Sequence, residues 1–339
     1  MPRATVVIPC FNHGRFIADA VRSALDQPGS ETRVVVVNDG STDGSTPAAC
    51  DACVGLGGAD RVRVIHQKNR GLPATRNVGA AAAGESGWDE YLVFLDGDDY
   101  LEPTFVARLH EEMLVAQDPE RSVSHVYCQE RLVDQATGIW TVPEWDSILL
   151  LVTNLHPVTT LVRRECFEAV GGFDESMRLG YEDWELWVRF SLRGWRGARV
   201  REPLFNWRRH SDITMIVEAV ARHDDLYVQI MERHKDAYSR HAFEIMRRAN
   251  ALLRRGDANW LDESHQSIPL RDMRLANEEL YRDNCRIRDW NQSLEKRLRK
   301  AGLLPAALPS TPPPPASAAA ASSPDVAQAD NGAALVAER

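Results

Sequence analysis

Four short apolar segments in the first 95 residues constrain the fold of this chain more than any other feature. They read TVVIPC (5–10), RVVVV (33–37), RVRVI (61–65) and YLVFL (91–95). Helical patterns separate them, and the clearest covers residues 14–27, where apolar side chains recur on one face. Continuous apolar strands alternating with helices predict an α/β fold with a mostly parallel, Rossmann-like central sheet flanked by helices.

Polar and glycine-rich residues follow each of these four segments. They occupy residues 9–12, 38–45, 66–71 and 96–99. In a parallel sheet the carboxyl ends of the strands meet at one edge, and ligands bind beyond that edge. We therefore expect these four segments to line a single pocket.

The triplet Asp96-Gly97-Asp98 is the sharpest local signal. One carboxylate can accept hydrogen bonds from a ribose, and the other can hold a divalent ion that bridges to a diphosphate. Gly97 allows a tight turn and close approach of a ligand. The alternative interpretation is a turn or a helix N-cap, with Asp99 capping a helix that begins near Glu102.

Asp39 is a second candidate. It follows a strand directly and precedes a glycine, where turn chemistry does not require a carboxylate. Such a carboxylate can accept an N–H from the edge of a nucleobase, and the Phe11 ring offers a face for the base to stack on. The nearby Ser41 and Asp43 have a simpler interpretation as caps of a helix that begins near Thr46.

With these motifs together, the chain resembles the family 2 glycosyltransferases, which have the GT-A fold. The resemblance covers residues 1 to about 215 and keeps the order of the family's motifs. The matching segments are VVIPCFN (6–12), VVNDGSTDGS (36–45), NRGLPATRNVGAAAAG (69–84), FLDGDDYLEP (94–103), FEAVGGFDESMRLGYEDWELWVRF (167–190) and WRRH (207–210).

This resemblance implies a metal-dependent enzyme that transfers a sugar from a nucleotide-sugar donor. Among such donors, a UDP-sugar is the expected one. The acceptor would be a hydroxyl of a glycan, a lipid-linked glycan or a protein, and the anomeric centre would be inverted. Mn²⁺ or Mg²⁺ would be the cofactor. Two alternatives remain: a nucleotidyltransferase, and an inactive domain that serves as a coiled-coil scaffold.

The resemblance also assigns roles to residues at the strand ends. Asp39 matches a carboxylate that accepts the uracil ring N–H, Asp98 matches the metal ligand, and His210 matches a histidine that completes the metal or diphosphate contacts. Phe11 stands where tyrosine is more usual, and Asn38 where many members have aspartate. The full donor-binding set is Pro9, Phe11, Asp39, Asn69, Arg76, Asp96, Gly97 and Asp98.

A helix of the form EDWELWVRF begins at Glu182. Acids at a helix N-terminus can simply favour the positive end of the helix dipole. The resemblance instead makes the second acid, Asp183, the general base, with Glu182 as the fallback or as an acceptor contact. An inverting displacement needs one base and one metal site, and no protein nucleophile.

Acceptor contacts are less well defined by the sequence. Asn154, His156 and Arg163 lie in the region where the family tends to contact its acceptor. Three tryptophans could stack on a sugar ring or belong to the core: Trp184, Trp187 and Trp207. For Trp187 we expect the core.

The rest of the chain divides by composition. We expect a catalytic domain over 1–215, a helical extension over 216–268, a coiled coil over 269–301 and a disordered Ala/Pro-rich tail over 302–339. The coiled coil predicts a homo-oligomer, and a single amphipathic helix on the catalytic domain is the alternative. Its a positions read Leu270, Asn277, Asn284, Asn291 and Leu298, and its d positions read Met273, Leu280, Ile287, Leu294 and Ala301.

Charge and hydropathy exclude several classes of protein. The net charge of −9 argues against nucleic-acid binding, which needs a basic surface. No apolar stretch reaches the roughly 18 residues of a membrane span, and no signal-peptide pattern is present. The six scattered cysteines are typical of reduced thiols. We therefore expect a cytoplasmic protein, with peripheral association at the cytoplasmic face of a membrane left open.

Overall fold

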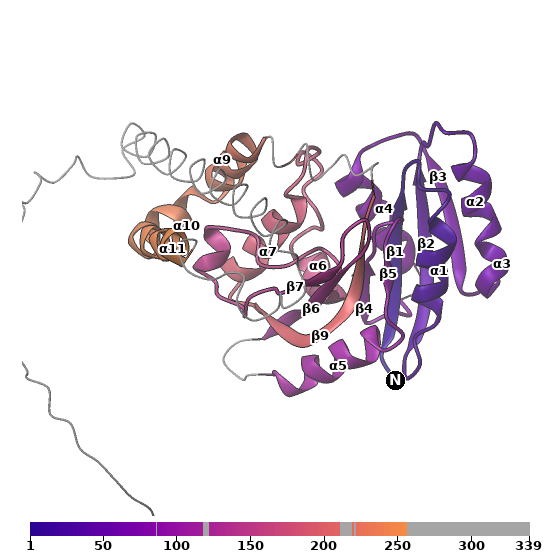
Figure 1. Ribbon diagram of the computed structural model, residues 1–339, viewed down its shortest axis with the longest axis horizontal. Coiled ribbons are helices and arrows are strands. Elements are labelled where there is room, and N and C mark those ends of the chain that lie inside the picture. Colours follow the sequence, from indigo (N-terminus) through magenta and orange to yellow (C-terminus); the bar gives the residue numbers. More distant parts are fainter. Residues whose placement is uncertain (86, 118–121, 211–218, 220–221, 256–339) are drawn as a thin grey trace, which may run out of the picture.

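The computed structural model describes residues 1–85, 87–117, 122–210, 219 and 222–255. This part of the chain forms one nine-stranded mixed sheet with helices on both faces (Figure 1). The strands are β1 (Arg3–Cys10), β2 (Glu31–Asp39), β3 (Val62–Gln67), β4 (Tyr91–Phe94), β5 (Tyr100–Leu101), β6 (Val123–Asp134), β7 (Gly138–Trp140), β8 (Leu161–Arg163) and β9 (Arg196–Arg209).

Along the chain, most helices lie between strands, and the final helices follow the last strand. They are α1 (Ile17–Leu25), α2 (Thr46–Ala52), α3 (Val54–Gly57), α4 (Leu72–Gly84), α5 (Phe105–Val115), the 3₁₀ turn η1 (Leu149–Leu151), α6 (Arg164–Ala169), α7 (Glu182–Leu192), α9 (His223–Arg233), α10 (Lys235–Arg240) and α11 (Ala242–Arg255). No helix in the described part of the chain is both long and apolar enough to span a membrane.

The strand order is β3-β2-β1-β4-β8-β6-β9-β5, with β7 added on β6. The first four strands are parallel, as the sequence predicts. The rest of the sheet is mixed and not mostly parallel. β6 and β9 are parallel to each other, but β8 runs antiparallel to both β4 and β6, and β5 and β7 are antiparallel to their neighbours. These later strands are short or mix polar with apolar residues, so they lack the continuous apolar pattern of buried parallel strands.

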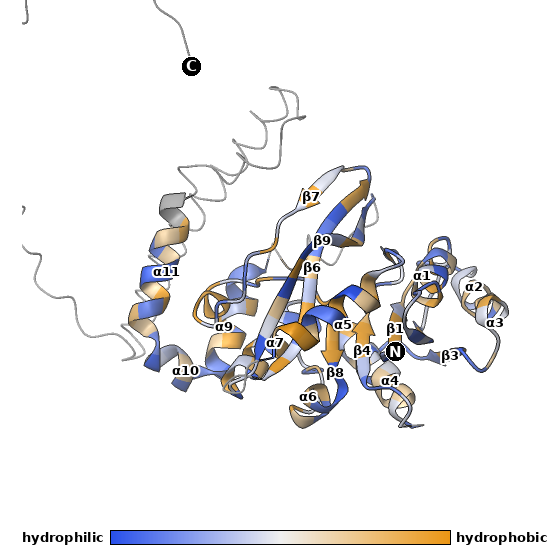
Figure 2. Cartoon of the chain, turned by 90° about the horizontal axis from the view of Figure 1, so that it is seen from below, coloured by the Kyte–Doolittle hydropathy of each residue, from blue (hydrophilic) through white to orange (hydrophobic). Residues whose placement is uncertain are grey.

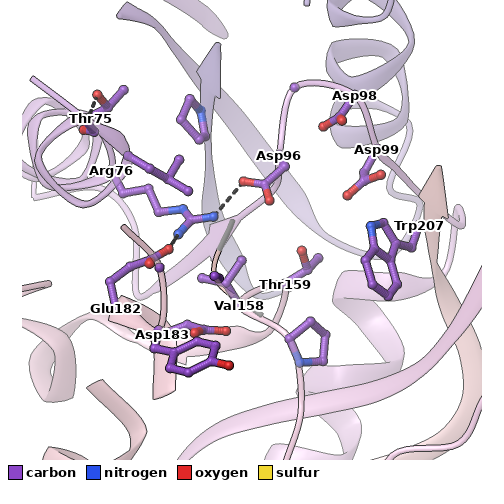
Figure 3. A pocket seen from close by; sticks show the side chains of 18 of the residues that line it. Thr75, Arg76, Asp96, Asp98, Asp99, Val158, Thr159, Glu182, Asp183 and Trp207 are labelled. Atoms are coloured by element: carbon purple, nitrogen blue, oxygen red, sulfur yellow. Dashed lines mark hydrogen bonds and ion pairs between the residues drawn. The ribbon is translucent and has the colours of Figure 1, made fainter. Parts of the chain in front are cut away.

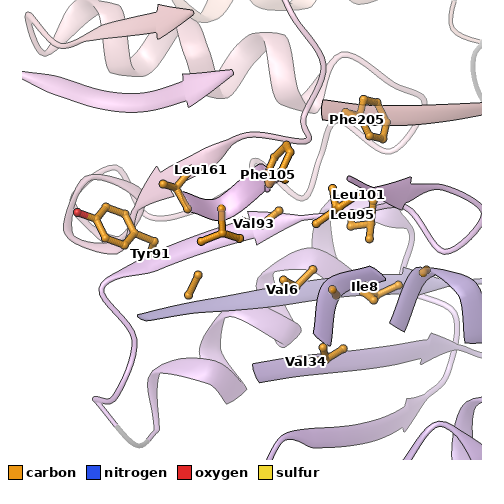
Figure 4. Close-up of a cluster of buried hydrophobic side chains, with 14 of the residues drawn as sticks. Val6, Ile8, Val34, Tyr91, Val93, Leu95, Leu101, Phe105, Leu161 and Phe205 are labelled. Carbon is orange, nitrogen blue, oxygen red and sulfur yellow. The ribbon is translucent and has the colours of Figure 1, made fainter. Parts of the chain in front are cut away.

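Two apolar layers cover the sheet. Side chains alternate along β1, so that Val6 and Ile8 pack with α1 and α5, whereas Val7 faces α4 on the other side. Figure 4 shows part of the first layer, where Phe105 of α5 and Leu161 of β8 lie with Val93 of β4. In the hydropathy view of Figure 2, β4 and β8 are mostly apolar, consistent with their burial.

Close packing of α4 on the sheet depends on Gly79. A Cβ atom at this position would lie 2.3 Å from Cγ1 of Val7, well inside van der Waals contact. The helix is thereby held close above β1 and β2, and its N-terminal end is placed at the carboxyl edge of the sheet. This places Arg76, one turn along α4, beside the ends of the central strands.

The helices α9 to α11 pack on the same core as the sheet (Figure 1). Tyr227 of α9 is buried and stacks on Trp184 of α7, with ring centroids 5.1 Å apart. Ile230 and Tyr238 join the same apolar cluster. The described part of the predicted helical extension therefore braces α7. The predicted coiled coil (269–301) and tail (302–339) lie outside the described residues.

Candidate active site

A cavity of about 1090 Å³ lies beyond the carboxyl ends of the central parallel strands. It gathers residues from the ends of β1 and β2, from the segment that follows β4, and from the first turns of α4 and α7. Nine of the ten site residues expected from the sequence line it: Pro9, Phe11, Asp39, Asn69, Arg76, Asp96, Gly97, Asp98 and Asp183. The tenth, His210, contacts Asp98.

Asp39 lines the cavity and also anchors the loop that follows β3. Its Oδ1 accepts hydrogen bonds from Gln67 Nε2 (2.7 Å) and from the backbone N–H of Arg70 (2.8 Å), and its Oδ2 accepts from the backbone N–H of Gly71 (3.0 Å). A carboxylate offers about four acceptor positions, so one remains for a ligand. This supporting role is one that the sequence pattern does not predict.

Arg76 connects the two acidic segments of the cavity (Figure 3). Its Nη2 donates to Asp96 Oδ1 at 2.7 Å and its Nη1 to Glu182 Oε1 at 2.5 Å. The side chain is only 2% exposed, so its charge is balanced by these two carboxylates. Glu182 is therefore held in an ion pair with Arg76.

Asp183 faces the cavity from the first turn of α7 (Figure 3). Its Oδ2 accepts from Asn154 Nδ2 at 3.0 Å, and its Oδ1 accepts from the backbone N–H of Trp184 at 2.7 Å. Burial raises the pKa of Asp183, while Arg76 and these two hydrogen bonds oppose the rise. A buried carboxylate that is held in place and has a raised pKa is suited to accept a proton.

Asp98 has two imidazoles around its carboxylate. His210 Nε2 lies 3.0 Å from Asp98 Oδ2, and His13 Nδ1 lies 3.5 Å from Asp98 Oδ1. The described residues contain no group of three or more His, Cys, Asp or Glu side chains that could hold a metal by themselves. Mg²⁺ and Mn²⁺ commonly bind through one or two protein ligands and substrate phosphates, so Asp98 with His210 fits an ion shared with the donor.

Comparison with known proteins bears on what this cavity does. Residues 5–171 match the family model for glycosyl transferase family 2. The chain belongs to glycosyltransferase family 2. The match covers β1 to β8 and the Asp96–Asp98 segment. The segment around Asp183 lies beyond it.

Individual relatives are similar to the chain over only part of its length. It is 38% identical over 112 residues to the glycosyltransferase EpsJ of Bacillus subtilis (33% of this chain, 30% of that protein), and 26% identical over 200 residues to a glycosyltransferase of Rickettsia typhi (56% and 58%). The chain thus spans less than two thirds of the length of both relatives. A crystal structure of S. aureus TarS residues 1–349 in complex with UDP superposes with a TM-score of 0.49 at 18% identity, over 70% of this chain and 75% of that one.

Two neighbours of the acidic segments have structural roles in the fold. Asp99 is buried and accepts from the backbone N–H of Arg208 at 2.7 Å, so it ties β9 to the cavity and does not cap α5, whose N-cap is Thr104. Asp43 accepts from the backbone N–H of Thr46 at 2.9 Å, which is the helix-capping role expected of it.

Gly97 has a packing reason of its own. A Cβ atom there would lie 3.0 Å from the backbone oxygen of Pro9, so glycine lets the segment after β4 pass close over β1 without a shift of either backbone. The sequence predicts that Gly97 allows close approach of a ligand; in the structure it allows close approach of the Pro9 backbone. The two aspartates that flank Gly97, Asp96 and Asp98, both line the cavity.

The acceptor candidates from the sequence divide into two groups. Asn154 lines the cavity and orients Asp183, and Trp207 also lines it. His156 lines it too, but its ring nitrogens lie 3.0 Å from His125 Nε2 and 3.0 Å from the Pro157 oxygen, so they are already used.

The other three do not reach the cavity. Arg163 pairs with Tyr91 at the start of β4, away from the carboxyl end that borders the cavity, and donates to the Val123 carbonyl oxygen at 2.8 Å. Trp187 is fully buried in the core, and Trp184 donates its indole N–H to the Leu150 oxygen.

Sequence reasoning missed the wall that β6, β7 and β9 contribute to the cavity. Glu130 and Trp140 belong to this wall, and neither lies in a segment for which a strand is predicted. Glu130 is only 5% exposed. The one available signal is an acidic residue inside VYCQERLVD, whose pattern is too mixed to predict a buried strand.

We expect replacement of Glu130 by glutamine to stabilise the fold more at pH 8 than at pH 5. Burial raises the pKa of Glu130 from 4.5 to about 8, Asp183 adds to the rise, and Arg209 opposes it. Between these pH values the folded protein keeps a proton that the unfolded chain releases, so stability falls as the pH rises. The gain at pH 8 should be on the order of a few kcal/mol, measured by chemical denaturation.

The control is Glu232→Gln, because Glu232 is an exposed glutamate of α9. It should change the free energy of unfolding little at either pH. An effect of Glu130→Gln that is equal at pH 5 and pH 8 would contradict the shifted titration.

Proposed function

We propose that this protein transfers a sugar from a nucleotide-sugar donor to a hydroxyl of a glycan, a lipid-linked glycan or a protein. The expected donor is a UDP-sugar, and the configuration of the anomeric carbon is inverted. The observation that carries the proposal is the placement of Asp183 across one cavity from Asp96 and Asp98 (Figure 3). A proton acceptor and the residues suited to a diphosphate thus face the same space.

The nucleoside is proposed to lie at the ends of β1 and β2. The Phe11 ring is 43% exposed at this edge of the cavity, which leaves a face for a base to stack on. Asp39 keeps one acceptor position for a ring N–H, and Asp96 faces the cavity where a ribose would follow. Arg76, which lines the cavity between Asp96 and Glu182, fixes this arrangement.

The reaction then needs one proton transfer by the protein. The acceptor hydroxyl oxygen bonds to the anomeric carbon while its proton passes to Asp183, and the bond from that carbon to the diphosphate oxygen breaks. Asn154 holds the Asp183 carboxylate during this step. A Mn²⁺ or Mg²⁺ ion bound by Asp98 and His210 would supply positive charge to the departing diphosphate.

The test is release of nucleoside diphosphate from a panel of nucleotide sugars with Mn²⁺ or Mg²⁺. We expect one donor to react, because many transferases hydrolyse their donor slowly without an acceptor. EDTA should abolish the release, and Asp98→Ala should lower it about 100-fold or more because the metal contribution amounts to several kcal/mol.

The matched control is Asp60→Ala, since Asp60 is an exposed aspartate outside the cavity. Release that persists in EDTA and in Asp98→Ala would overturn the metal role. Absence of metal-dependent binding of every donor would favour the inactive scaffold. Self-association through residues 269–301 remains a prediction, to be measured as the mass of the full chain in solution.

A further inference from the structure

Three adjacent strands present an aromatic and acidic face to the cavity. Glu130 of β6 pairs with Trp140 of β7 on one side and with Phe205 of β9 on the other. Two residues further along, Leu132 pairs with Trp207. Paired residues and their i+2 neighbours lie on the same side of a sheet. Glu130, Trp140, Phe205 and Trp207 all line the cavity accordingly.

Glu130 is a buried carboxyl without a protein partner in the described part of the chain. It is 5% exposed, lines the cavity, and forms no hydrogen bond or ion pair with any described residue. Asp183 raises the pKa of Glu130 and Arg209 lowers it. Arg209 lies over the Trp207 ring, 4.4 Å from its centroid. Leaving a buried carboxyl unpaired costs free energy, and a ligand that hydrogen-bonds to it would recover that cost.

Trp140 adds an apolar surface beside this carboxyl. It is 48% exposed although it faces the cavity, and its ring centroid lies 5.6 Å from that of Trp207. An exposed tryptophan beside a second, partly buried one in the wall of a cavity is typical of a binding surface. Aromatic rings pack well against the C–H face of a sugar, while the sugar hydroxyls need polar partners such as a carboxyl.

We propose that Glu130, Trp140 and Trp207 form an acceptor subsite that holds a pyranose ring, so that the acceptor of this enzyme ends in a sugar. The proposal rests on the proposed transfer reaction. Among the acceptor classes, it selects a glycan or lipid-linked glycan over a protein side chain. The ring would stack on the tryptophans, and hydroxyls beside the reacting one would bond to Glu130.

The position of this subsite separates it from the donor. The nucleoside is proposed to lie at β1 and β2, whereas β4 and β8 stand between β1 and β6 in the sheet. Figure 3 shows Trp207 across the cavity from Arg76 and Glu182, with Asp183 below the open space between them. Glu130 and Asp183 line the same cavity, so a ring on this wall can offer its hydroxyl to the proposed base.

The experiment measures binding of nitrophenyl pyranosides to the full chain, by saturation-transfer NMR without donor. The panel contains the α and β forms of the common hexoses and N-acetylhexosamines. We expect at least one to bind the wild type. Trp140→Ala and Glu130→Leu should each weaken that binding about tenfold or more, the effect of losing a stacking face or a hydrogen bond to a buried carboxyl.

Two further variants make the result specific. Glu130→Gln keeps hydrogen-bonding groups and should bind more tightly than Glu130→Leu. Trp88→Ala changes a tryptophan outside the cavity, whose ring packs under Arg33, and should bind like the wild type. A cooperative denaturant-unfolding transition shows that these variants are folded. Metal-dependent UDP binding, measured by calorimetry, should persist in Glu130→Leu and Trp140→Ala.

The outcomes separate the subsite from the reaction. If no pyranoside binds the wild type, or if Trp140→Ala and both Glu130 variants bind like the wild type, the subsite is overturned even where donor turnover is present. Loss of UDP binding in folded Glu130 variants would place Glu130 on the donor side and would also overturn it. Pyranoside binding that depends on Trp140 and Glu130 supports the subsite even if no donor is ever turned over.

Discussion

Replacing Asp183 by asparagine should lower the turnover of sugar transfer about 10²–10⁴-fold, the usual contribution of a positioned general base. Donor affinity should change little, because Asp183 contacts Asn154 and the Trp184 backbone, away from the nucleoside end of the cavity. Asparagine keeps the size of the side chain and cannot take the proton. The measurement is kcat for diphosphate release together with the Kd for UDP.

A matched control distinguishes a base from an acid that merely favours a helix terminus. Asp224 is an exposed aspartate in the first turn of α9, as Asp183 is in the first turn of α7. Asp224→Asn should leave turnover unchanged. Full turnover in Asp183→Asn would show that Asp183 only complements the helix dipole and that another group accepts the proton.

Replacing Arg76 by methionine should destabilise the protein by about 3–5 kcal/mol, because it leaves a buried carboxylate without its partner. Arg76 is 2% exposed and holds Asp96 and Glu182 at 2.7 and 2.5 Å. The same change should weaken donor binding, since the segment that carries Asp96 loses its anchor. Denaturant unfolding and UDP calorimetry measure the two effects.

Two comparisons test the origin of this loss. Arg3→Met removes an exposed ion pair with Glu90 and should cost at most about 1 kcal/mol. The double variant Arg76→Met/Glu182→Gln should recover part of the stability, because the carboxylate left in the core becomes a neutral amide. If the single variant is as stable as Arg3→Met, the buried network does not hold the two acidic segments together.

The sequence predicts the parallel half of the sheet well, for a physical reason. β1, β2 and β4 are buried on both faces, so each is a run of apolar residues that only a covered strand accommodates. Because parallel strands end at one edge, the polar residues that follow them can be expected to meet. The cavity that contains Asp39, Asp96 and Asp98 is that meeting point.

The mixed half of the sheet, from β8 to β5, depends on contacts that a sequence pattern does not encode. β6 alternates less clearly and β8 has only three residues, so neither predicts a strand by itself. The ion pairs of Arg76 join residues 20 and 106 positions apart. The loop-anchoring role of Asp39 and the lone carboxyl of Glu130 likewise appear only once distant segments are brought together.

The central claim is an inverting transfer with Asp183 as base, and the anomeric configuration of the first product tests it most directly. A nucleotide α-sugar from the donor panel is incubated with the protein and Mn²⁺, and the anomeric proton of the released sugar is followed by NMR before mutarotation. The account predicts that the β-anomer forms first and that Asp183→Asn loses it. The α-anomer as the first product would contradict a single displacement and with it the role of Asp183.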